Sequence, residues 1–282
     1  MLVNLHNHTP LCRHARGEPD QYARAAQEAG TAVFGFADHL PYPPGFIEPE
    51  PDCTILPERF PDYMASVNAL RRITRRGMSI LVGVEVDHIS EYVEWTARTV
   101  SDLEIDYAIG SIHTLRGMAV DYNRPELEAL VRKCGGRDAF LADYFAQLRR
   151  MVEGGWAHVI GHLDIYKKFD GDGTMFPRDE ARPFVEDFLD YLAAIPKARR
   201  PVLEINTAGY SKECREAYPA EEIVRSAASR GIEFTLGSDS HAPDQVNRNC
   251  AQATDLLRRC GVRRLAYFIR RKRYYKRLPE EK

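Results

Sequence analysis

The 282-residue sequence lacks the cysteine pattern of a disulfide framework and lacks any long hydrophobic run. Its six cysteines are scattered without a Cys-x-x-Cys pair, which indicates free thiols in a reducing compartment. No apolar run approaches the roughly 18 residues needed to span a bilayer, and the chain does not open on a charged segment followed by an apolar stretch. We therefore expect a cytoplasmic location and no membrane partner.

A strong excess of either charge is also lacking. The formal net charge is -2, so overall electrostatics favour neither nucleic acid nor an acidic membrane as a partner. The one basic run is RRKRYYKR at 270–277, and we interpret 270–282 as a basic C-terminal tail with a solvated surface. Linkers rich in Gly/Ser or Pro are absent as well, which indicates a single domain over 1–282.

Short apolar runs rich in β-forming residues recur along the chain, with a helical pattern between most of them. They carry continuous hydrophobic stretches, as parallel strands covered on both faces do, and lie at 2–5, 32–39, 80–87, 106–113, 158–164, 201–206 and 234–241. The helical patterns lie at 19–29, 57–76, 91–103, 137–154, 178–195, 219–230 and 245–260. Seven such units predict an α/β fold with one closed or nearly closed parallel barrel, and a doubly wound open sheet is the competing architecture. Two long loops, at 40–56 and 114–136, are typical of functional or mobile segments.

All seven strand ends carry side chains that bind metal ions or support metal ligands: His6-x-His8, Asp38-His39, Glu85-x-Asp87, His113, His162-x-Asp164, Glu204-x-Asn206 and Asp239-x-His241. Barrels of this class build their active sites at this face, from residues of several strands. Residues i and i+2 of a strand point to the same side, so His6 and His8 can bind one ion together, as can Asp239 and His241. Imidazole and carboxylate ligands suit zinc, manganese or iron.

A single histidine at a strand end is more often a hydrogen-bonded structural residue than a ligand. Here six of the nine histidines stand at strand ends, together with Glu85 and Asp239, so we predict a metal site. His88 and His158 fall outside the pattern and are interpreted as structural, and Cys12 as a small buried hydrophobe. The sequence has no Gly-x-Ser-x-Gly elbow and no P-loop, so neither motif offers a competing mechanism.

Seven motifs follow one another between residues 6 and 243: HNHT followed by His14, then FADH, GVEVD, GSIHT, GHLD, EINTAG and GSDSHAP. Together they resemble the PHP (polymerase and histidinol phosphatase) superfamily, and most of all its stand-alone bacterial histidinol-phosphate phosphatases. The segments HTPLCRHA at 8–15 and GHLDIYKKF at 161–169 are similar to local signatures of that branch. The resemblance spans residues 1 to about 270. It implies a distorted (β/α)7 TIM-like barrel that holds three divalent metal ions.

Carried over by position, the resemblance implies nine metal ligands: His6, His8, His14, His39, Glu85, His113, His162, Asp239 and His241. It implies that Glu85 bridges two ions, and that Glu85, His113 and Asp239 are catalytic. Lys168 and Lys212 occupy the positions of the basic side chains that meet the substrate phosphate in this family, and Arg16 is a further candidate. Relatives often have arginine there, so lysine exchanges a bidentate grip on phosphate for a point charge. The segment QVNRN at 245–249 also departs from the family, which usually has glycine after the valine.

These inferences predict a metal-dependent phosphatase that hydrolyses L-histidinol phosphate to L-histidinol and phosphate in histidine biosynthesis. Clustered divalent ions acidify a bound water and clamp the attacking and leaving oxygens, so we expect attack on phosphorus by a metal-bridging hydroxide. Residues that orient ligand imidazoles or the substrate amine would be Asp38, Asp87, Asp164, Glu204 and Asn206.

Three alternatives stay open at this stage. They are a PHP phosphoesterase acting on another small phosphate monoester, a nuclease, and a metal-binding or regulatory protein without catalysis. The expected partner is a small-molecule phosphate monoester rather than nucleic acid. The sequence indicates no particular oligomeric state.

Overall fold

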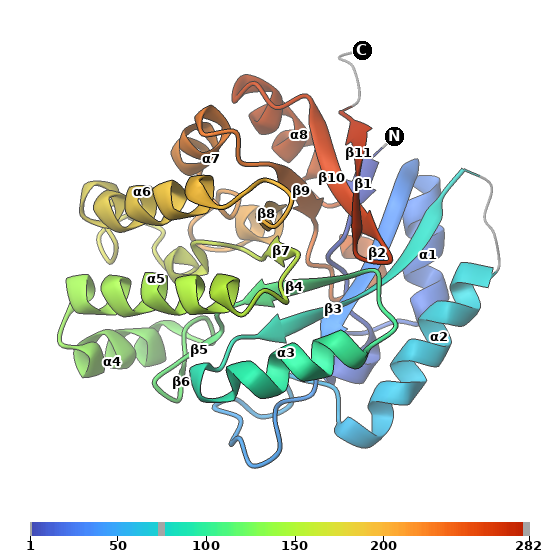
Figure 1. Ribbon diagram of the computed structural model, residues 1–282, viewed down its shortest axis with the longest axis horizontal. Helices are drawn as coiled ribbons and strands as arrows, with labels where there is room; N and C mark the ends of the chain where they lie inside the picture. Colours follow the sequence, from blue (N-terminus) through green and yellow to red (C-terminus); the bar gives the residue numbers. More distant parts are fainter. Residues whose placement is uncertain (1, 73–76, 279–282) are drawn as a thin grey trace.

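Seven parallel strands form the centre of the computed structural model, which describes residues 2–72 and 77–278. Figure 1 shows them surrounded by helices, in the order β1-β2-β3-β4-β7-β8-β9. Their bounds are Leu2–Asn4 (β1), Thr31–His39 (β2), Ser79–Asp87 (β3), Tyr107–Ser111 (β4), Val159–Ile160 (β7), Val202–Asn206 (β8) and Phe234–Gly237 (β9). All seven strands predicted from the sequence are confirmed, with ends that differ by a few residues.

Hydrogen bonds between the first and last strands bring the two edges of this sheet together. Leu5 N donates to Leu236 O at 2.9 Å, and beyond the strand ends Asp239 N donates to His6 O at 2.8 Å. The sheet is therefore a nearly closed, distorted α/β barrel, as predicted, and the open doubly wound alternative is wrong. Closure places the C-terminal ends of all seven strands around one opening.

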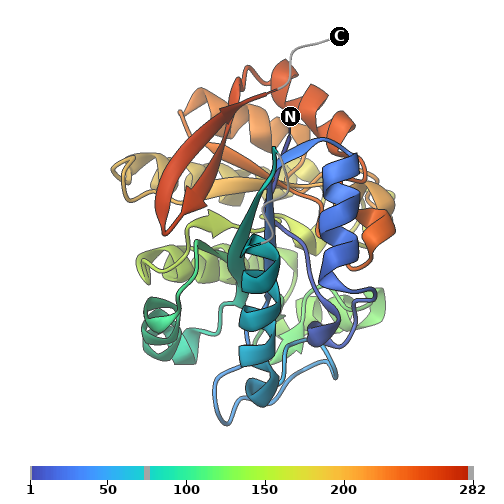
Figure 2. The same cartoon turned by 90° about the vertical axis from the view of Figure 1, so that its right-hand side faces the viewer.

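The helices that follow the strands cover the outside of the barrel (Figures 1 and 2). The predicted helices correspond to Pro19–Glu28 (α1), Phe60–Arg72 (α2), Val93–Asp102 (α3), Arg137–Glu153 (α5), Arg178–Ala194 (α6), Glu221–Ser229 (α7) and Cys250–Arg259 (α8). Residues 73–76 of the predicted helix 57–76 lie outside the described residues. Short 3-10 turns lie at Pro10–Cys12 (η1), Pro57–Arg59 (η2), Ser90–Tyr92 (η3), Ile165–Lys167 (η4), Ala208–Ser211 (η5) and Pro243–Gln245 (η6).

The segment 114–136, predicted as a loop, contains regular structure. It forms a small hairpin of Thr114–Leu115 (β5) and Met118–Ala119 (β6), followed by the helix Arg124–Cys134 (α4). Asn123 caps this helix by accepting from Glu126 N at 2.9 Å, and Gly135 ends it with φ of 98°. The loop prediction was therefore wrong over α4, whose cap and stop signals were present in the sequence.

The C-terminal basic run is also structured, in contrast to the predicted tail. Arg264–Ile269 (β10) pairs antiparallel with Lys272–Arg277 (β11). In β11, Arg273 and Tyr275 both direct their polar ends to Glu233, at 3.0 and 2.9 Å. The charged residues of the run hid this pairing at the sequence level. The predicted solvated surface is present on β11, and residues 279–282 lie outside the described part of the chain.

One tyrosine fills the barrel below the opening. Tyr107 is fully buried and donates from its hydroxyl to the Phe36 carbonyl at 3.2 Å. A Cβ atom at Gly35 or Gly83 would lie within 2.5 Å of this tyrosine, so both strands need glycine there. The interior is thus solid beneath the strand ends, and the open space lies above them. Within the described residues, no helix combines the length and hydropathy that crossing a bilayer requires.

Candidate metal centre and substrate cavity

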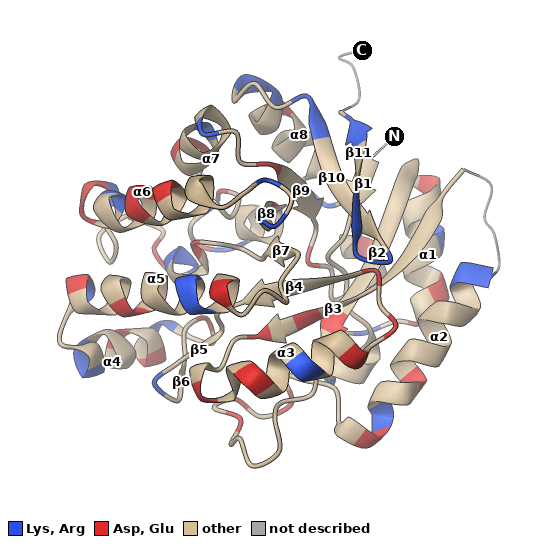
Figure 3. Ribbon diagram, in the orientation of Figure 1, with Lys and Arg blue, Asp and Glu red and all other residues tan. Residues whose placement is uncertain are grey.

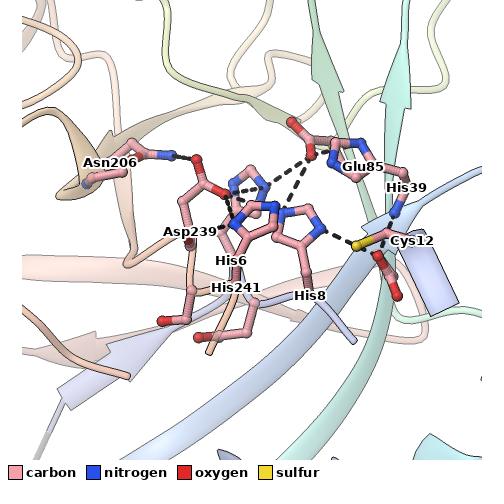
Figure 4. A network of polar contacts seen from close by, with 12 residues as sticks. His6, His8, Cys12, His39, Glu85, Asn206, Asp239 and His241 are labelled. Carbon is pink, nitrogen blue, oxygen red and sulfur yellow. Dashed lines mark hydrogen bonds and ion pairs between the residues drawn. The ribbon is translucent and has the colours of Figure 1, made fainter. Parts of the chain in front are cut away.

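Glu85, near the C-terminal end of β3, is the centre of the polar cluster at the barrel opening (Figure 4). Its side chain is only 1% exposed. Its carboxylate oxygens lie 3.1 Å from His6 Nε2, 3.2 Å from His39 Nδ1 and 2.9 Å from His162 Nε2. His113 Nε2 lies 3.5 Å away. Strands β2 and β3 and the segments that follow β1, β4 and β7 therefore converge on one carboxylate.

The segment after β9 and the loop after β1 complete the cluster. Asp239 Oδ1 lies 3.0 Å from His8 Nε2, and His14 Nε2 lies 2.8 Å from His241 Nε2. Asp239 has φ of 51°, a left-handed conformation that aspartate tolerates better than most residues. The structure brings together all nine predicted ligands: His6, His8, His14, His39, Glu85, His113, His162, Asp239 and His241.

The donor geometry fits bound metal ions. His6 Nε2 is buried and has no hydrogen-bond partner, although it faces Glu85 and Asp239. Ring nitrogens also face one another in the His14–His241 pair at 2.8 Å and the His113–His162 pair at 3.2 Å. A cation placed between or beside such a pair can accept the lone pairs of both ring nitrogens. Four overlapping groups of described residues could each hold an ion: His6, His8 and Glu85; His39, Glu85 and His113; His14, His39 and His241; and His8, Cys12 and His241.

Carboxylates behind the ligands fix the imidazole rings. Glu204 Oε1 lies 2.7 Å from His6 Nδ1, and Asp38 Oδ1 lies 3.2 Å from His8 Nδ1. A Cβ at position 237 would lie 2.0 Å from Glu204 Oε1, so Gly237 makes room for this contact. Each carboxylate leaves the Nε2 atom of its histidine directed at the cluster. This is the arrangement by which metal-binding proteins orient ligand histidines.

The remaining expected supports act in two ways. Asn206 Nδ2 donates to Asp239 Oδ2 at 3.2 Å, and Asp87 accepts from the His113 backbone N–H at 2.8 Å. Both contacts position a predicted ligand. Asp164 instead accepts from Ala220 N and pairs with Lys167, so it braces the loops beside the site.

The electrostatics of the cluster favour ionised carboxylates and divide the imidazoles into two groups. Against the effect of burial, nearby carboxylates raise the pKa of His6 and raise that of His8 to about 9, whereas His39 and His241 are held neutral. Burial would raise the pKa of Glu85 and of Asp239, but His6 and its neighbours hold both well below their ordinary values. Burial, together with the nearby charge of His8, holds the pKa of His39 and of His241 well below its ordinary value. Deprotonated carboxylates and neutral imidazoles are the forms that bind metals.

Cys12 lies beside the cluster with its Sγ atom 4.0 Å from His14 Nε2. Burial, followed by the charge of Asp38, raises the pKa of this thiol far above its ordinary value. A protonated, fully buried thiol agrees with the interpretation of Cys12 as a small hydrophobe.

A cavity of about 430 Å³ opens above the cluster. Lys168, Lys212 and Arg248 line it together with the upper ligands. Lys168 Nζ is paired with Asp121 Oδ2 at 2.8 Å. The pKa of Lys212 is lowered by burial and then by the charge of Lys168. The two lysines predicted to meet phosphate therefore lie close together at the cavity wall.

The loop 40–56 forms another part of the cavity wall. Glu50 and its neighbours from Pro49 to Cys53 line the cavity. Arg13 holds this loop in place through Glu48 at 3.0 Å and Asp52 at 2.7 Å. Burial and the nearby charge of Asp121 raise the pKa of Glu50 to about 8. The loop thus places a second carboxyl group near Asp121.

Arg16 is the predicted phosphate contact that the structure does not bring to the cavity. Its side chain is 74% exposed and lies 3.3 Å from Asp244. Sequence reasoning gave no role to Arg248, Asp121 or Glu50, all of which line the cavity. Arg248 lies within the segment QVNRN, whose departure from the family pattern could have drawn attention to it. Asp121 and Glu50 lie in loops, and no periodic pattern predicts the path of a loop.

A nearly closed barrel with clustered histidines and carboxylates at its strand ends defines the class of α/β-barrel proteins with a multinuclear metal site. The chain belongs to the PHP domain family, whose family model matches residues 4–208.

A relative agrees with this assignment, and two solved structures share the fold. A Deinococcus radiodurans protein named "Probable histidinol-phosphatase" is 35% identical over 266 residues, covering 94% of this chain and 96% of that protein. A candidate histidinol phosphatase from Listeria monocytogenes superimposes with a TM-score of 0.81 at 23% identity, over 89% of this chain and 99% of that one. Histidinol phosphate phosphatase from Lactococcus lactis was solved with Zn, L-histidinol and phosphate. It superimposes with a TM-score of 0.76 at 19% identity, over 97% of this chain and 98% of that one. These two structures confirm the barrel fold.

Proposed function

We propose that this chain is a metal-dependent phosphoric monoester hydrolase that converts L-histidinol phosphate to L-histidinol and phosphate. The observation that carries the proposal is the donor cluster around Glu85, which forms the floor of a cavity lined by Lys168 and Lys212. The name of the Deinococcus relative and the ligands of the Lactococcus structure support the same substrate.

The nine donors would hold three divalent ions, of zinc, manganese or iron. Glu85 belongs to two of the four overlapping donor groups among the described residues, which supports its role as a shared ligand. When bound, such ions neutralise charge on the phosphoryl oxygens and lower the pKa of water. Glu85, His113 and Asp239 would be the catalytic residues because each belongs to the donor cluster and also lines the cavity.

The cations at the cavity wall would bind the phosphate and orient it for displacement. Lys212 contributes a point charge, whereas Lys168 shares its charge with Asp121. Arg248 adds a guanidinium, which can contact two phosphate oxygens at once. These contacts hold the ester over the donor cluster while the leaving oxygen faces the open cavity.

The other end of the substrate carries an ammonium group and an imidazole. Glu50 and Asp121 line the cavity and can accept hydrogen bonds from these groups. The cavity therefore offers cations to the phosphate and carboxyl groups to the amine, which matches the charge distribution of histidinol phosphate.

Substrate preference tests this proposal. The purified, metal-loaded protein is assayed for phosphate release from L-histidinol phosphate, glycerol phosphate and p-nitrophenyl phosphate, and for cleavage of a single-stranded oligonucleotide. We expect the highest kcat/KM with L-histidinol phosphate. A higher kcat/KM with another ester, or cleavage of the oligonucleotide alone, would refute the assignment of substrate.

A further inference from the structure

A second cavity, of about 860 Å³, lies at the opposite end of the barrel from the metal centre. Its walls come from the β10–β11 hairpin, the segment that follows α6 and the residues just before β7. The hairpin is tied to this end because Arg270 N donates to Asp106 Oδ1 at 2.9 Å, and Asp106 immediately precedes β4. This cavity is therefore separate from the proposed active site.

Positive charge is concentrated around this second cavity. Its lining carries five basic side chains, Arg199, Arg200, Arg271, Lys272 and Arg273, and among the described lining residues one carboxylate, Glu153. The whole chain has a net charge of only -2, so this excess is local. Figure 3 shows the basic residues along β11 and at its turn. A cavity with this imbalance attracts anions.

Three of the arginines are held in fixed positions, mostly by neutral groups. Arg271 Nη2 donates to the carbonyls of Val100 and Leu103, both at 2.7 Å. Arg200 Nε donates to the Ile195 carbonyl at 3.1 Å. Neutral carbonyls fix a guanidinium group without neutralising its formal charge. Arg273 does have a carboxylate partner, Glu233, which is shared with Lys197 and Arg264.

Two of the five cations are available to a ligand. Arg199 and Lys272 are both exposed at the cavity, and their side chains have no ion-pair partner among the described residues. Both can therefore approach an anion without breaking an existing contact.

His158 adds a directed hydrogen-bond donor. Its Nδ1 atom accepts from Ala108 N at 3.1 Å. Burial, followed by the charges of Arg271 and Arg273, lowers its pKa to about 4, so the ring is neutral at pH 7. A neutral ring that accepts at Nδ1 carries its proton on Nε2. His158 lines the cavity, and this N–H is the donor it can offer there.

The cavity also has an aromatic side. Phe268 and Tyr191 line it, together with Pro196 and Pro201. The Phe268 ring is itself buried, at 2% exposed, with the His158 ring edge-on at 5.4 Å and the Arg273 guanidinium over it at 5.7 Å. Tyr191 is partly exposed and offers the accessible aromatic surface. A ligand that combines negative charge with a flat ring would use both kinds of surface.

We propose that this cavity is a binding site for a small organic phosphate of the mononucleotide class. The phosphate contacts Arg199, Lys272 and the His158 N–H, and the ring lies against Tyr191 and Pro196. The site is independent of the proposed phosphatase activity, because it lies at the other end of the barrel and shares no lining residue with the upper cavity.

Isothermal titration calorimetry of the metal-loaded protein with AMP tests this site. The double variant Arg199→Glu/Lys272→Glu reverses the two available charges at exposed positions, so we expect it to fold normally. It should bind AMP at least tenfold more weakly than the wild type and keep its phosphatase rate. Lys212→Ala, in the upper cavity, is the matched control and should keep the AMP affinity of the wild type.

Further ligands identify what the cavity recognises. Adenosine, which lacks the phosphate, should give no binding, and inorganic phosphate should bind more weakly than AMP. The proposal is overturned if AMP does not bind, if the double variant binds it as well as the wild type, or if Lys212→Ala alone removes binding. Tight binding of a single-stranded oligonucleotide without AMP binding would also overturn it, in favour of a nucleic-acid surface.

Discussion

His6 Nδ1 lies 2.7 Å from Glu204 Oε1, and both side chains are fully buried. The carboxylate accepts the Nδ1 proton and leaves Nε2 facing Glu85 and Asp239. Glu204 and Glu85 also raise the pKa of His6, against the effect of burial, which means that the surroundings favour positive charge on this ring. A metal ion at Nε2 satisfies the same preference.

Glu204→Gln should therefore weaken metal binding without removing a ligand. The glutamine amide accepts the His6 Nδ1–H hydrogen bond without a negative charge, so it stabilises the ligand ring less. We therefore expect the affinity for metal to fall by about 10–100-fold. Metal content after dialysis against a graded chelator series measures this. Glu222→Gln, on α7 at the surface, is the control and should match the wild type. Equal metal retention in both variants would refute the role of Glu204.

Glu85→Gln should abolish turnover. The substitution removes the charge that two donor groups share while preserving the size of the side chain. We expect bound metal to fall and phosphate release to drop to background, with the circular dichroism spectrum unchanged. Wild-type activity in a folded Glu85→Gln protein would contradict the central position given to this residue.

Lys212→Ala should impair binding of the phosphate group. A charge-assisted hydrogen bond to phosphate contributes about 1.5–3 kcal/mol, so KM for L-histidinol phosphate should rise by about tenfold or more. Arg16→Ala provides the comparison, because Arg16 is exposed and lies outside the cavity. Steady-state kinetics should show the increase for Lys212→Ala alone, and an equal effect of both variants would contradict the geometry described.

The buried, neutral state of His88 should make the protein less stable in acid. His88 is 2% exposed, and burial followed by the charge of Arg150 lowers its pKa to about 4, from 6.5 in the unfolded chain. Between these values the unfolded state binds a proton that the native state does not, so the free energy of unfolding falls as the pH decreases from 6.5 to 4. At pH 5, His88 lowers the free energy of unfolding by about 2 kcal/mol relative to its value at high pH.

Urea unfolding at pH 8 and pH 5 measures this effect. Other groups titrate in the same range, so the relevant quantity is the difference between the wild type and His88→Gln. The variant should lose less stability on acidification than the wild type, by about 2 kcal/mol. Equal losses in the two proteins would exclude His88 as a source of acid sensitivity.

The barrel and the gathering of these side chains at its opening were predictable from local sequence patterns, whereas the nine-ligand set followed from the family resemblance and stays a prediction. Each strand is a short apolar run, and each donor stands at the end of such a run or, for His14, in a recognisable motif nearby. Closure of the barrel then brings residues as distant as His14 and His241 to 2.8 Å. The periodicity of parallel strands determines which face carries the donors, so the sequence contained the required information.

The parts that sequence reasoning missed depend on longer-range packing. The pairing of β11 with β10 is obscured by the charges of Lys272 and Arg273, although it is stabilised by Glu233 from a distant segment. The position of the Arg16 side chain also depends on a distant residue, because Asp244 pairs with it outside the cavity, and its contact with phosphate stays a prediction. Glu50 reaches the cavity only because Arg13 holds the loop through Glu48 and Asp52.

Restoration of activity by metal tests the account most directly. The protein is stripped of metal with a chelator, and phosphate release from L-histidinol phosphate is measured before and after zinc or manganese is added back. We predict no release from the stripped protein and recovery of turnover on adding either metal, with L-histidinol formed in equal amount to phosphate. Full activity in the stripped protein, or none in protein shown to be metal-loaded, would contradict the account.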